Sequence, residues 1–309
     1  MNSSGPLVSV VVPSYNRPTA LLDSLTSVEE QTYPNVEVVV VDDASEKPVD
    51  EVLDKDSFSY PITVVRHEEN QGASAARNTG IDRLDGKFVA FLDDDDIWEP
   101  RKIEEQIDRF QEASDDTGVV YTGMRFIGED DESLRTHIET VEGDVTKELL
   151  RRNFVGSFST VMVRLEAIND TGTLDQRFSC WQDIEWYIRL SMHWKFASVP
   201  KPLVRMRQQG GEHISDNFDT IRHTALSLFV EKYRPLARSY GWGFEREFLG
   251  WIEFRVGAYN ALRTGHYSAA QYHLLRAVKW YPLEWQFWVF LFVSLGRKPM
   301  YNLAKKAVR

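Results

Sequence analysis

The 309-residue sequence contains one cysteine, Cys180, so no disulfide can form within the chain and the fold does not depend on an oxidising compartment. We interpret Cys180 as an ordinary buried thiol, because no basic activator is evident near it. No stretch reaches the roughly 20 apolar residues that span a bilayer. Residues 1–6 lack the basic and apolar regions of a signal peptide. We therefore expect a cytoplasmic location.

Glycine-rich phosphate-binding loops are also missing. Residues 12–17, which follow the first apolar run, contain no glycine, whereas a dinucleotide-binding fold has Gly-x-Gly-x-x-Gly at this point. There is no P-loop, and the Gly-rich basic loop of sugar-1-phosphate nucleotidyltransferases does not occur either. These absences exclude dinucleotide-dependent oxidoreductases, P-loop enzymes and nucleotidyltransferases.

Composition is that of a globular protein, with 42% hydrophobic and 27% charged residues. The charge, however, is unevenly distributed. Residues 1–215 carry 22 basic and 40 acidic residues, a formal charge of −18, whereas residues 216–309 carry 14 basic and 7 acidic residues, a formal charge of +7. The change of sign predicts two domains, 1–215 and 216–309, that face different partners.

Short continuous apolar runs alternate with helical patterns in the first half. Continuous runs are typical of strands buried on both faces, as in a parallel sheet, and the alternation predicts an open α/β fold. In such a fold the ligand crevice lies beyond the carboxyl ends of the strands. The expected strands cover residues 8–12, 36–41, 62–65, 88–92, 119–126, 159–163 and 196–204, and the expected helices 18–28, 72–84 and 99–113. After residue 215 the pattern is helical, with a helical hairpin over 258–281 joined near Gly265.

The most informative segment is Asp93–Asp96, four adjacent carboxylates directly after a buried strand. Like charges this close raise one another's pKa unless a cation intervenes. A run of acids is usually a solvated loop, but this one lies between two apolar segments. Oxygen ligands of this kind suit a hard divalent cation, so we predict a Mn²⁺ or Mg²⁺ site. Such an ion would neutralise charge on a departing diphosphate.

A transfer reaction to a hydroxyl group also needs a general base. The segment 180–190 predicts an amphipathic helix with Asp183 near its start, where the helix dipole favours a carboxylate. Asp183 is the preferred base. Glu185 is a rival base, and a pure capping role for Asp183 is a third interpretation.

Four motifs, in this order, are similar to those of the family 2 glycosyltransferases. They lie in residues 8–18, 41–45, 70–80 and 91–98, and the likeness extends over about residues 7–215. The resemblance implies a GT-A fold with a mixed, mainly parallel sheet and an inverting, single-displacement transfer of sugar from a nucleotide-diphosphate sugar. It also implies roles for individual residues: Pro13 and Tyr15 beside the nucleoside, Asp42 on the base edge, Asp94 at the ribose, Asp93 and Asp95 at the metal, and Arg77 at the phosphates or the acidic loop.

Two positions depart from the pattern of the family. The usual Glu-Asp pair before the base helix is Gln182-Asp183, so the expected base is kept and its neighbour has no charge. Gln209 occupies the place of a histidine that often binds the metal, and His213, four residues on, is the substitute that we expect.

The tail suggests a membrane-bound partner. Residues 283–295 are rich in large aromatic side chains, and residues 285–309 contain no acid but five basic residues. This pattern favours peripheral contact of residues 283–309 with the inner face of the cell membrane, although a helix packed on the rest of the protein is an equal alternative. A glycan or polyprenyl-phosphate-linked acceptor is then expected, and no nucleic-acid partner.

The Gln-x-x-Arg-Trp motif of processive synthases is missing, so we expect addition of a single sugar. The expected setting is assembly of a cell-surface glycan or of a lipid-linked oligosaccharide for protein glycosylation. The alternative is a catalytically silent GT-A-like scaffold at the membrane.

Overall fold

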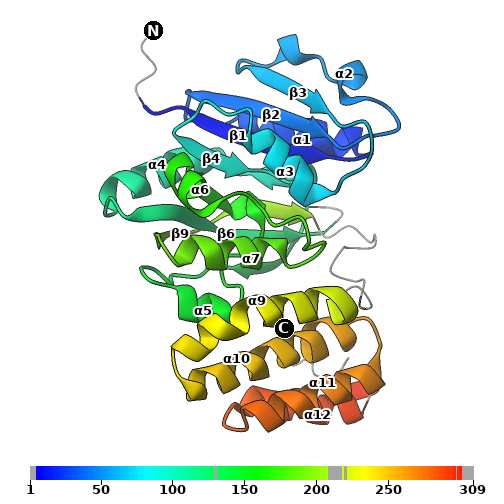
Figure 1. Cartoon of the computed structure of the whole chain (residues 1–309). Coiled ribbons are helices and arrows are strands. Elements are labelled where there is room, and N and C mark those ends of the chain that lie inside the picture. Colours follow the sequence, from blue (N-terminus) through cyan, green and yellow to red (C-terminus); the bar gives the residue numbers. More distant parts are fainter. Residues whose placement is uncertain (1–4, 129–130, 208–217, 219–220, 297, 301–309) are drawn as a thin grey trace. The chain divides into compact units, whose positions relative to one another are not determined.

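The computed structural model describes residues 5–128, 131–207, 218, 221–296 and 298–300 (Figure 1). The chain forms two compact units. The first contains residues 1–146, 153–177 and 182–210, and the second contains 147–152, 178–181 and 211–309. Two short segments that precede residue 182 therefore pack with the helical part, which a single cut along the chain does not capture.

The first unit is built on a mixed sheet. Its described strands run in the order β3-β2-β1-β4-β8-β6-β9-β5, with β7 beside β6. Pairs β1–β2, β2–β3, β1–β4 and β6–β9 are parallel, whereas β8 runs antiparallel between β4 and β6. The bounds are β1 Val8–Ser14, β2 Val36–Asp42, β3 Ile62–Arg66, β4 Phe88–Phe91, β5 Asp96–Trp98, β6 Thr117–Ile127, β7 Ser133–His137, β8 Val161–Arg164 and β9 Lys195–Arg207.

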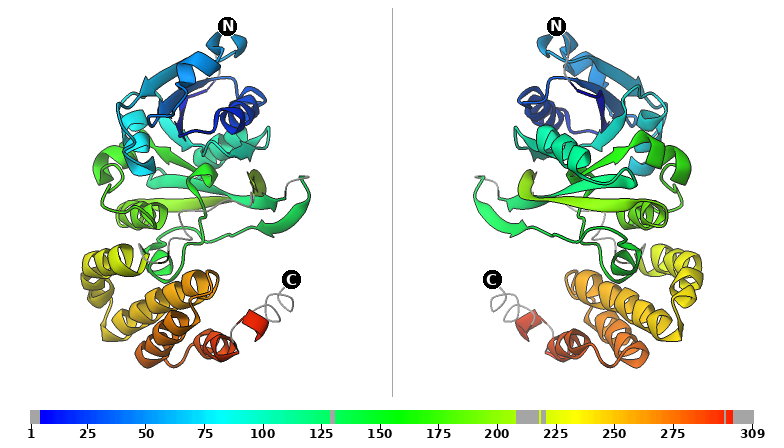
Figure 2. Two further views of the ribbon diagram at one scale, coloured as in Figure 1. Left: turned by 90° about the vertical axis from the view of Figure 1, so that its right-hand side faces the viewer. Right: turned by 90° about the vertical axis from the view of Figure 1, so that its left-hand side faces the viewer.

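Helices cover both faces of this sheet (Figures 1 and 2). Alternate residues of one strand serve the two faces, because side chains in a strand point alternately up and down. Val38 and Val40 join the core beneath α1 and α4, while Val39 and Val41 pack with Ala76 of α3. The helices are α1 Pro18–Glu29, α2 Val49–Val52, α3 Ala73–Ile81, α4 Lys102–Glu112, α6 Leu165–Thr171 and α7 Gln182–Ser191, with 3-10 turns at Lys55–Ser57 and Phe158–Thr160.

The parallel strands bring polar residues to one edge. Ser14 at the end of β1 is in register with Asp42 at the end of β2, and Asp42 is in register with Arg66 at the end of β3. The acidic loop follows β4, which is the neighbour of β1 on the other side. This is the edge at which open α/β sheets bind ligands.

Over its described residues, the regular secondary structure of the second unit is helical. It contains α9 Leu226–Ser239, α10 Trp242–Phe254, α11 Tyr267–Trp280 and α12 Trp285–Leu295, together with most of α5 (Thr146–Arg151). The expected hairpin is present, with its turn at Gly265, whose φ of 83° is in the left-handed region that favours glycine. Phe254 and Phe287 stack in the core with ring centroids 4.9 Å apart. Among the described helices, none combines the length and apolar character needed to cross a bilayer.

Candidate active site

Asp94 lies in the middle of the acidic loop and is buried. Its Oδ2 accepts hydrogen bonds from the Ser14 hydroxyl at 2.9 Å and from the backbone N–H of Tyr15 at 3.3 Å. The Arg17 guanidinium donates to Oδ1 at 3.1 Å. These contacts tie the loop to the end of β1 and to the start of α1, so the position of Asp94 is fixed by three groups from one neighbouring segment.

Arginines neutralise two further acids of the loop. Arg17 also donates to Asp95 at 2.6 Å, although Arg17 is half exposed. Arg77 of α3 pairs with Asp93, is almost fully buried, and lies 4.1 Å above the ring of Phe158. The geometry thus directs Arg77 to the acidic loop, one of its two predicted roles. Arg17 was missed: it lies inside a quoted motif, but its position beside the cluster depends on the turn before α1.

The loop carries more negative charge than these arginines remove. The pKa of Asp94 is raised to about 6: burial is the main cause, the charge of Arg17 and the hydrogen bond from Ser14 act in the opposite direction, and the charges of Asp95 and Asp93 raise it. Burial and the same two acids raise the pKa of Asp96 well above its usual value. Asp96 Oδ2 is buried without a hydrogen-bond partner among the described residues. A cluster with this excess of oxygen ligands and charge fits a hard divalent cation.

The protein supplies only part of such a metal site. In the described part of the chain, no group of three or more His, Cys, Asp or Glu side chains is arranged to hold an ion. Asp93 and Asp95 would therefore contribute two carboxylates, and water and phosphate oxygens would complete the coordination, as is usual for Mg²⁺. Both Gln209 and the predicted ligand His213 lie outside the described residues.

The predicted nucleoside contacts lie beside this loop. The aromatic side chain of Tyr15, next to Asp94, is 47% exposed to solvent. Pro13 is half-buried in β1. Asp42, in contrast, is fully buried. Burial raises its pKa, but hydrogen bonds from Ser45, from Val49 and from Arg66 outweigh this effect and hold the pKa below its usual value.

Asp42 is therefore an ionised acceptor that shapes the turn after β2. Its predicted contact with the base edge stays a prediction, because its oxygens bind the N–H groups of Ser45 and Val49 in this conformation. Sequence reasoning also missed a buried link next to it. The Asp43 carboxylate lies 2.7 Å from His67 Nδ1 and accepts backbone N–H groups of Gln71 and Gly72 at 2.9 and 2.8 Å, which anchors the loop before α3.

Asp183 lies in the first turn of α7 and is half-buried. Its Oδ2 accepts a hydrogen bond from the Asn153 side chain at 2.8 Å. Asn153 is itself held by Gly156, whose backbone N–H donates to Asn153 Oδ1 at 3.0 Å. The neighbouring Gln182 accepts from the Ser74 hydroxyl at 2.5 Å, which ties the start of α7 to α3. The candidate base Asp183 is therefore oriented by Asn153, whose side chain is itself held by the backbone of Gly156.

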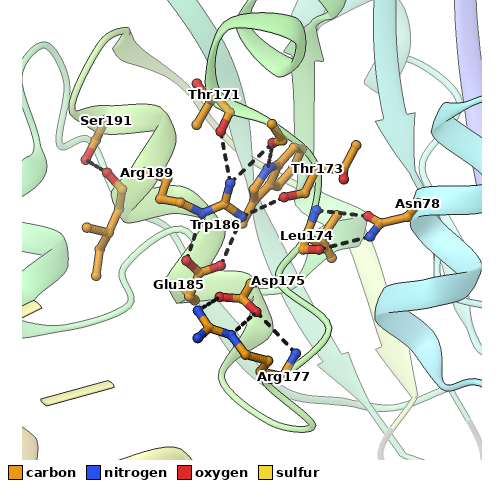
Figure 3. Close-up of polar contacts among 12 residues, drawn as sticks. Asn78, Thr171, Thr173, Leu174, Asp175, Arg177, Glu185, Trp186, Arg189 and Ser191 are labelled. Carbon is orange, nitrogen blue, oxygen red and sulfur yellow. Dashed lines mark hydrogen bonds and ion pairs between the residues drawn. The ribbon is translucent and has the colours of Figure 1, made fainter. Parts of the chain in front are cut away.

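Figure 3 shows why the rival base Glu185 is disfavoured. Glu185 is fully buried, and Arg189 donates to both of its oxygens at 2.8 and 3.0 Å. Arg189 also donates to the carbonyl oxygens of Thr171 and Thr173 at 3.1 and 2.8 Å. Glu185 therefore fixes α7 against the loop after α6 and is not accessible to a substrate.

Tyr187 connects the two halves of the site electrostatically. Its hydroxyl is buried and has no hydrogen-bond partner among the described residues. Burial raises its pKa well above the usual value, the charges of Asp183 and Asp93 raise it further, and the charge of Arg77 lowers it. Phe158 connects the two sides: Arg77, the partner of Asp93, lies 4.1 Å above its ring, and the Tyr187 ring lies 5.9 Å from it. The helix that carries the candidate base therefore packs beside the acidic loop, although ninety residues separate Asp93 from Asp183 in the chain. The sequence indicated only an amphipathic helix over residues 180–190 and no role for Tyr187 in the site.

The fold and this site define an α/β protein with an acidic ligand site beyond the carboxyl ends of its strands. The sequence model described as glycosyl transferase family 2 matches residues 9–172, which is more than half of the chain, so the chain belongs to this family. The family that the motifs suggested is confirmed.

Individual similarities agree. The chain is 35% identical over 167 residues to the putative teichuronic acid biosynthesis glycosyltransferase TuaG of Bacillus subtilis, covering 54% of this chain and 65% of TuaG, just under two thirds of that relative's length. The S. aureus TarS structure with UDP-GlcNAc superposes with a TM-score of 0.58 at 19% identity, covering 89% of each chain. The mannosyltransferase PcManGT of Pyrobaculum calidifontis, solved with GDP-Man and Mn²⁺, gives a TM-score of 0.61 at 16% identity, covering 98% of this chain and 84% of that one. The predicted GT-A fold is confirmed.

Proposed function

We propose that this protein transfers one sugar from a nucleotide-diphosphate sugar to an acceptor hydroxyl, with inversion at the anomeric carbon, during assembly of a cell-surface glycan. The observation that carries the proposal is a chain of contacts: Arg77 pairs with Asp93 of the acidic loop and lies 4.1 Å above the Phe158 ring. The Phe158 ring packs 5.9 Å from the ring of Tyr187, on the helix that carries Asp183. An acidic loop for the donor and a carboxylate base for the acceptor are the two components that such a displacement needs. The similarity to TuaG supports a role in cell-surface glycan assembly.

Each site residue has a separate role in the proposed transfer. Tyr15 packs on the nucleobase, Asp94 faces the ribose, and Asp93 and Asp95 hold the divalent cation, Mn²⁺ or Mg²⁺. That cation supplies charge neutralisation at the diphosphate leaving group. Asp183, oriented by Asn153 at 2.8 Å, accepts the proton of the acceptor hydroxyl as that oxygen attacks the anomeric carbon. The PcManGT complex with GDP-Man and Mn²⁺ supports the choice of donor and ion.

The test is transfer itself. Purified protein is incubated with Mn²⁺, a panel of UDP-, GDP- and dTDP-sugars and simple acceptor sugars, and the anomeric configuration of the product is read by NMR. A product with the opposite configuration to the donor is expected. Retention would overturn the single-displacement mechanism. Neither transfer nor hydrolysis of any donor would favour the alternative, a silent GT-A-like scaffold.

We also propose that the protein works at the cytoplasmic face of a membrane on a lipid-linked acceptor such as a polyprenyl-phosphate sugar. One face of α12 supports this proposal. Its large apolar side chains recur at helical spacing and stay between 44% and 67% exposed, namely Trp285, Trp288, Val289, Phe292 and Leu295. The segment from residue 285 to the end contains basic residues but no acid, so an anionic bilayer interface is the matching partner.

A further inference from the structure

The helical unit contains a cleft that the proposed chemistry does not use. Its volume is about 760 Å³, and it is lined by residues of α9, α10 and α11, three helices that pack side by side (Figure 1), and by Arg222 of the π-helical turn Ile221–Ala225 before α9. Apolar side chains, among them Leu226, Val230 and Trp280, form part of its lining. The rest is charged, with four arginines against three glutamates.

One buried carboxylate in the cleft holds two arginines. Glu245 is only 3% exposed and accepts hydrogen bonds from Arg234 Nε and Arg238 Nη1, both at 2.7 Å. The hydrogen bond from Arg234 is the main cause that lowers the pKa of Glu245, so this group stays ionised. The single negative charge of Glu245 faces the two positive charges of Arg234 and Arg238, so this triad keeps a net positive charge.

A second carboxylate fixes another wall of the cleft. Glu253 is 4% exposed, accepts from Arg276 Nε at 2.6 Å, and lies 2.7 Å from His273 Nδ1. Each of these arginines uses its Nε or one Nη for the carboxylate behind it, and a guanidinium has five N–H donors. Donors therefore remain on side chains that are already held in place, which reduces the entropy lost when an anion binds.

We propose that this cleft binds an anionic saccharide, with a sugar ring against Trp280 and a carboxylate or phosphate substituent on the arginines. The anion preference follows from the cleft alone. The choice of a saccharide rests on the proposed function, for which the cleft would be a second site that holds an acidic acceptor glycan. Guanidinium groups bind planar carboxylates and phosphates through paired hydrogen bonds, and the indole ring provides an apolar face for a sugar.

The test uses a charged probe and its neutral counterpart. Trigalacturonic acid, its methyl ester and inorganic phosphate are titrated calorimetrically into the whole protein at low salt. The acid should bind at least about tenfold more tightly than the ester or phosphate.

The double variant Arg222→Gln with Arg238→Gln should weaken binding of the acid about tenfold or more, since charge-assisted hydrogen bonds are lost. Both side chains are exposed, and Glu245 keeps Arg234, so folding is preserved. Lys279→Gln is the matched control, because Lys279 is an exposed cation of α11 that does not line the cleft.

Equal binding of acid and ester, binding of neither, or unchanged affinity in the double variant would overturn the proposal. Phosphate that binds as tightly as the acid would overturn the saccharide part. Turnover of nucleotide sugar by the same preparations reports separately on the proposed function. If the protein turns over its nucleotide-sugar donor but does not bind trigalacturonate, the cleft proposal alone is overturned.

Discussion

At the scale of the residue, Asp183 is the group on which the proposed transfer depends. Its orientation comes from Asn153, and its neighbour Gln182 has no charge that would compete for the acceptor proton. A carboxylate held in this way can accept a proton during the reaction, whereas the neutral amide of an asparagine cannot.

Asp183→Asn should therefore lower transfer by a factor of about 100 or more while donor binding is retained. Turnover with acceptor and calorimetric binding of the donor measure the two quantities separately. Asp170→Asn, the same change at an exposed position of α6, should leave both at the wild-type level. Near-normal turnover in the Asp183 variant would remove this residue from the mechanism.

The buried hydroxyl of Tyr187 leads to a prediction about stability. A buried hydroxyl without a partner costs free energy, so Tyr187→Phe should raise the free energy of unfolding by about 1 kcal/mol. Tyr121→Phe is the matched change of opposite sign: its hydroxyl donates to the carbonyl oxygen of Val141 at 2.8 Å, and its loss should cost about 1 kcal/mol. Urea unfolding of both variants tests this, and a destabilised Tyr187→Phe would show that the hydroxyl has a partner.

At the scale of the element, α4 carries an unusually buried amine. Lys102 is fully buried, donates from Nζ to Gln106 Oε1 at 2.7 Å, and lies 3.9 Å above the ring of Trp98. Burial lowers its pKa well below the ordinary value of 10.5. Below pH 10.5 the unfolded chain binds this proton more strongly than the native protein, so unfolding is favoured as pH falls from 10.5 toward the native pKa.

The stability of the wild type should accordingly rise with pH above neutrality, by up to about 1.4 kcal/mol per pH unit from this group. Lys102→Met should remove that rise and be the more stable protein at pH 7.5, with the difference shrinking by pH 9.5. Urea unfolding at the two pH values measures this, and exposed Lys87→Met is the control that should keep the wild-type slope. A constant difference at both pH values would mean that the buried amine is charged.

The elements themselves were largely predictable, because their causes are local. The continuous apolar run at 36–41 became β2, and the Pro18 start and apolar spacing of the next helix became α1. The antiparallel insertion of β8 between β4 and β6 was not predictable, since it depends on pairing between residues more than seventy positions apart.

The candidate site divides in the same way. The sequence was sufficient to predict site roles for Asp93–Asp96 and Asp183, because their charge is unusual beside apolar segments. The partners Arg17, Asn153 and His67 were not, since each is an ordinary polar residue whose role depends on how loops meet in space.

At the scale of the whole molecule, the apolar face of α12 and the charge of the tail make a prediction about membranes. The double variant Trp288→Glu with Phe292→Glu should lose sedimentation with vesicles of phosphatidylglycerol, because both side chains would have to bring a charge into the interface. Leu275→Glu, at an exposed leucine of α11, is the control and should sediment normally. No binding of the wild type to these vesicles, or self-association through this face, would contradict the membrane proposal.

The central claim is that the acidic loop holds a divalent cation together with the diphosphate of a sugar nucleotide. The most direct measurement is calorimetric titration of UDP-, GDP- and dTDP-sugars, with and without Mn²⁺, into the wild type and Asp95→Ala. One donor should bind the wild type with Mn²⁺ and bind at least about tenfold more weakly when either the ion or the Asp95 carboxylate is removed. Equal binding to both proteins with the ion present would contradict the account.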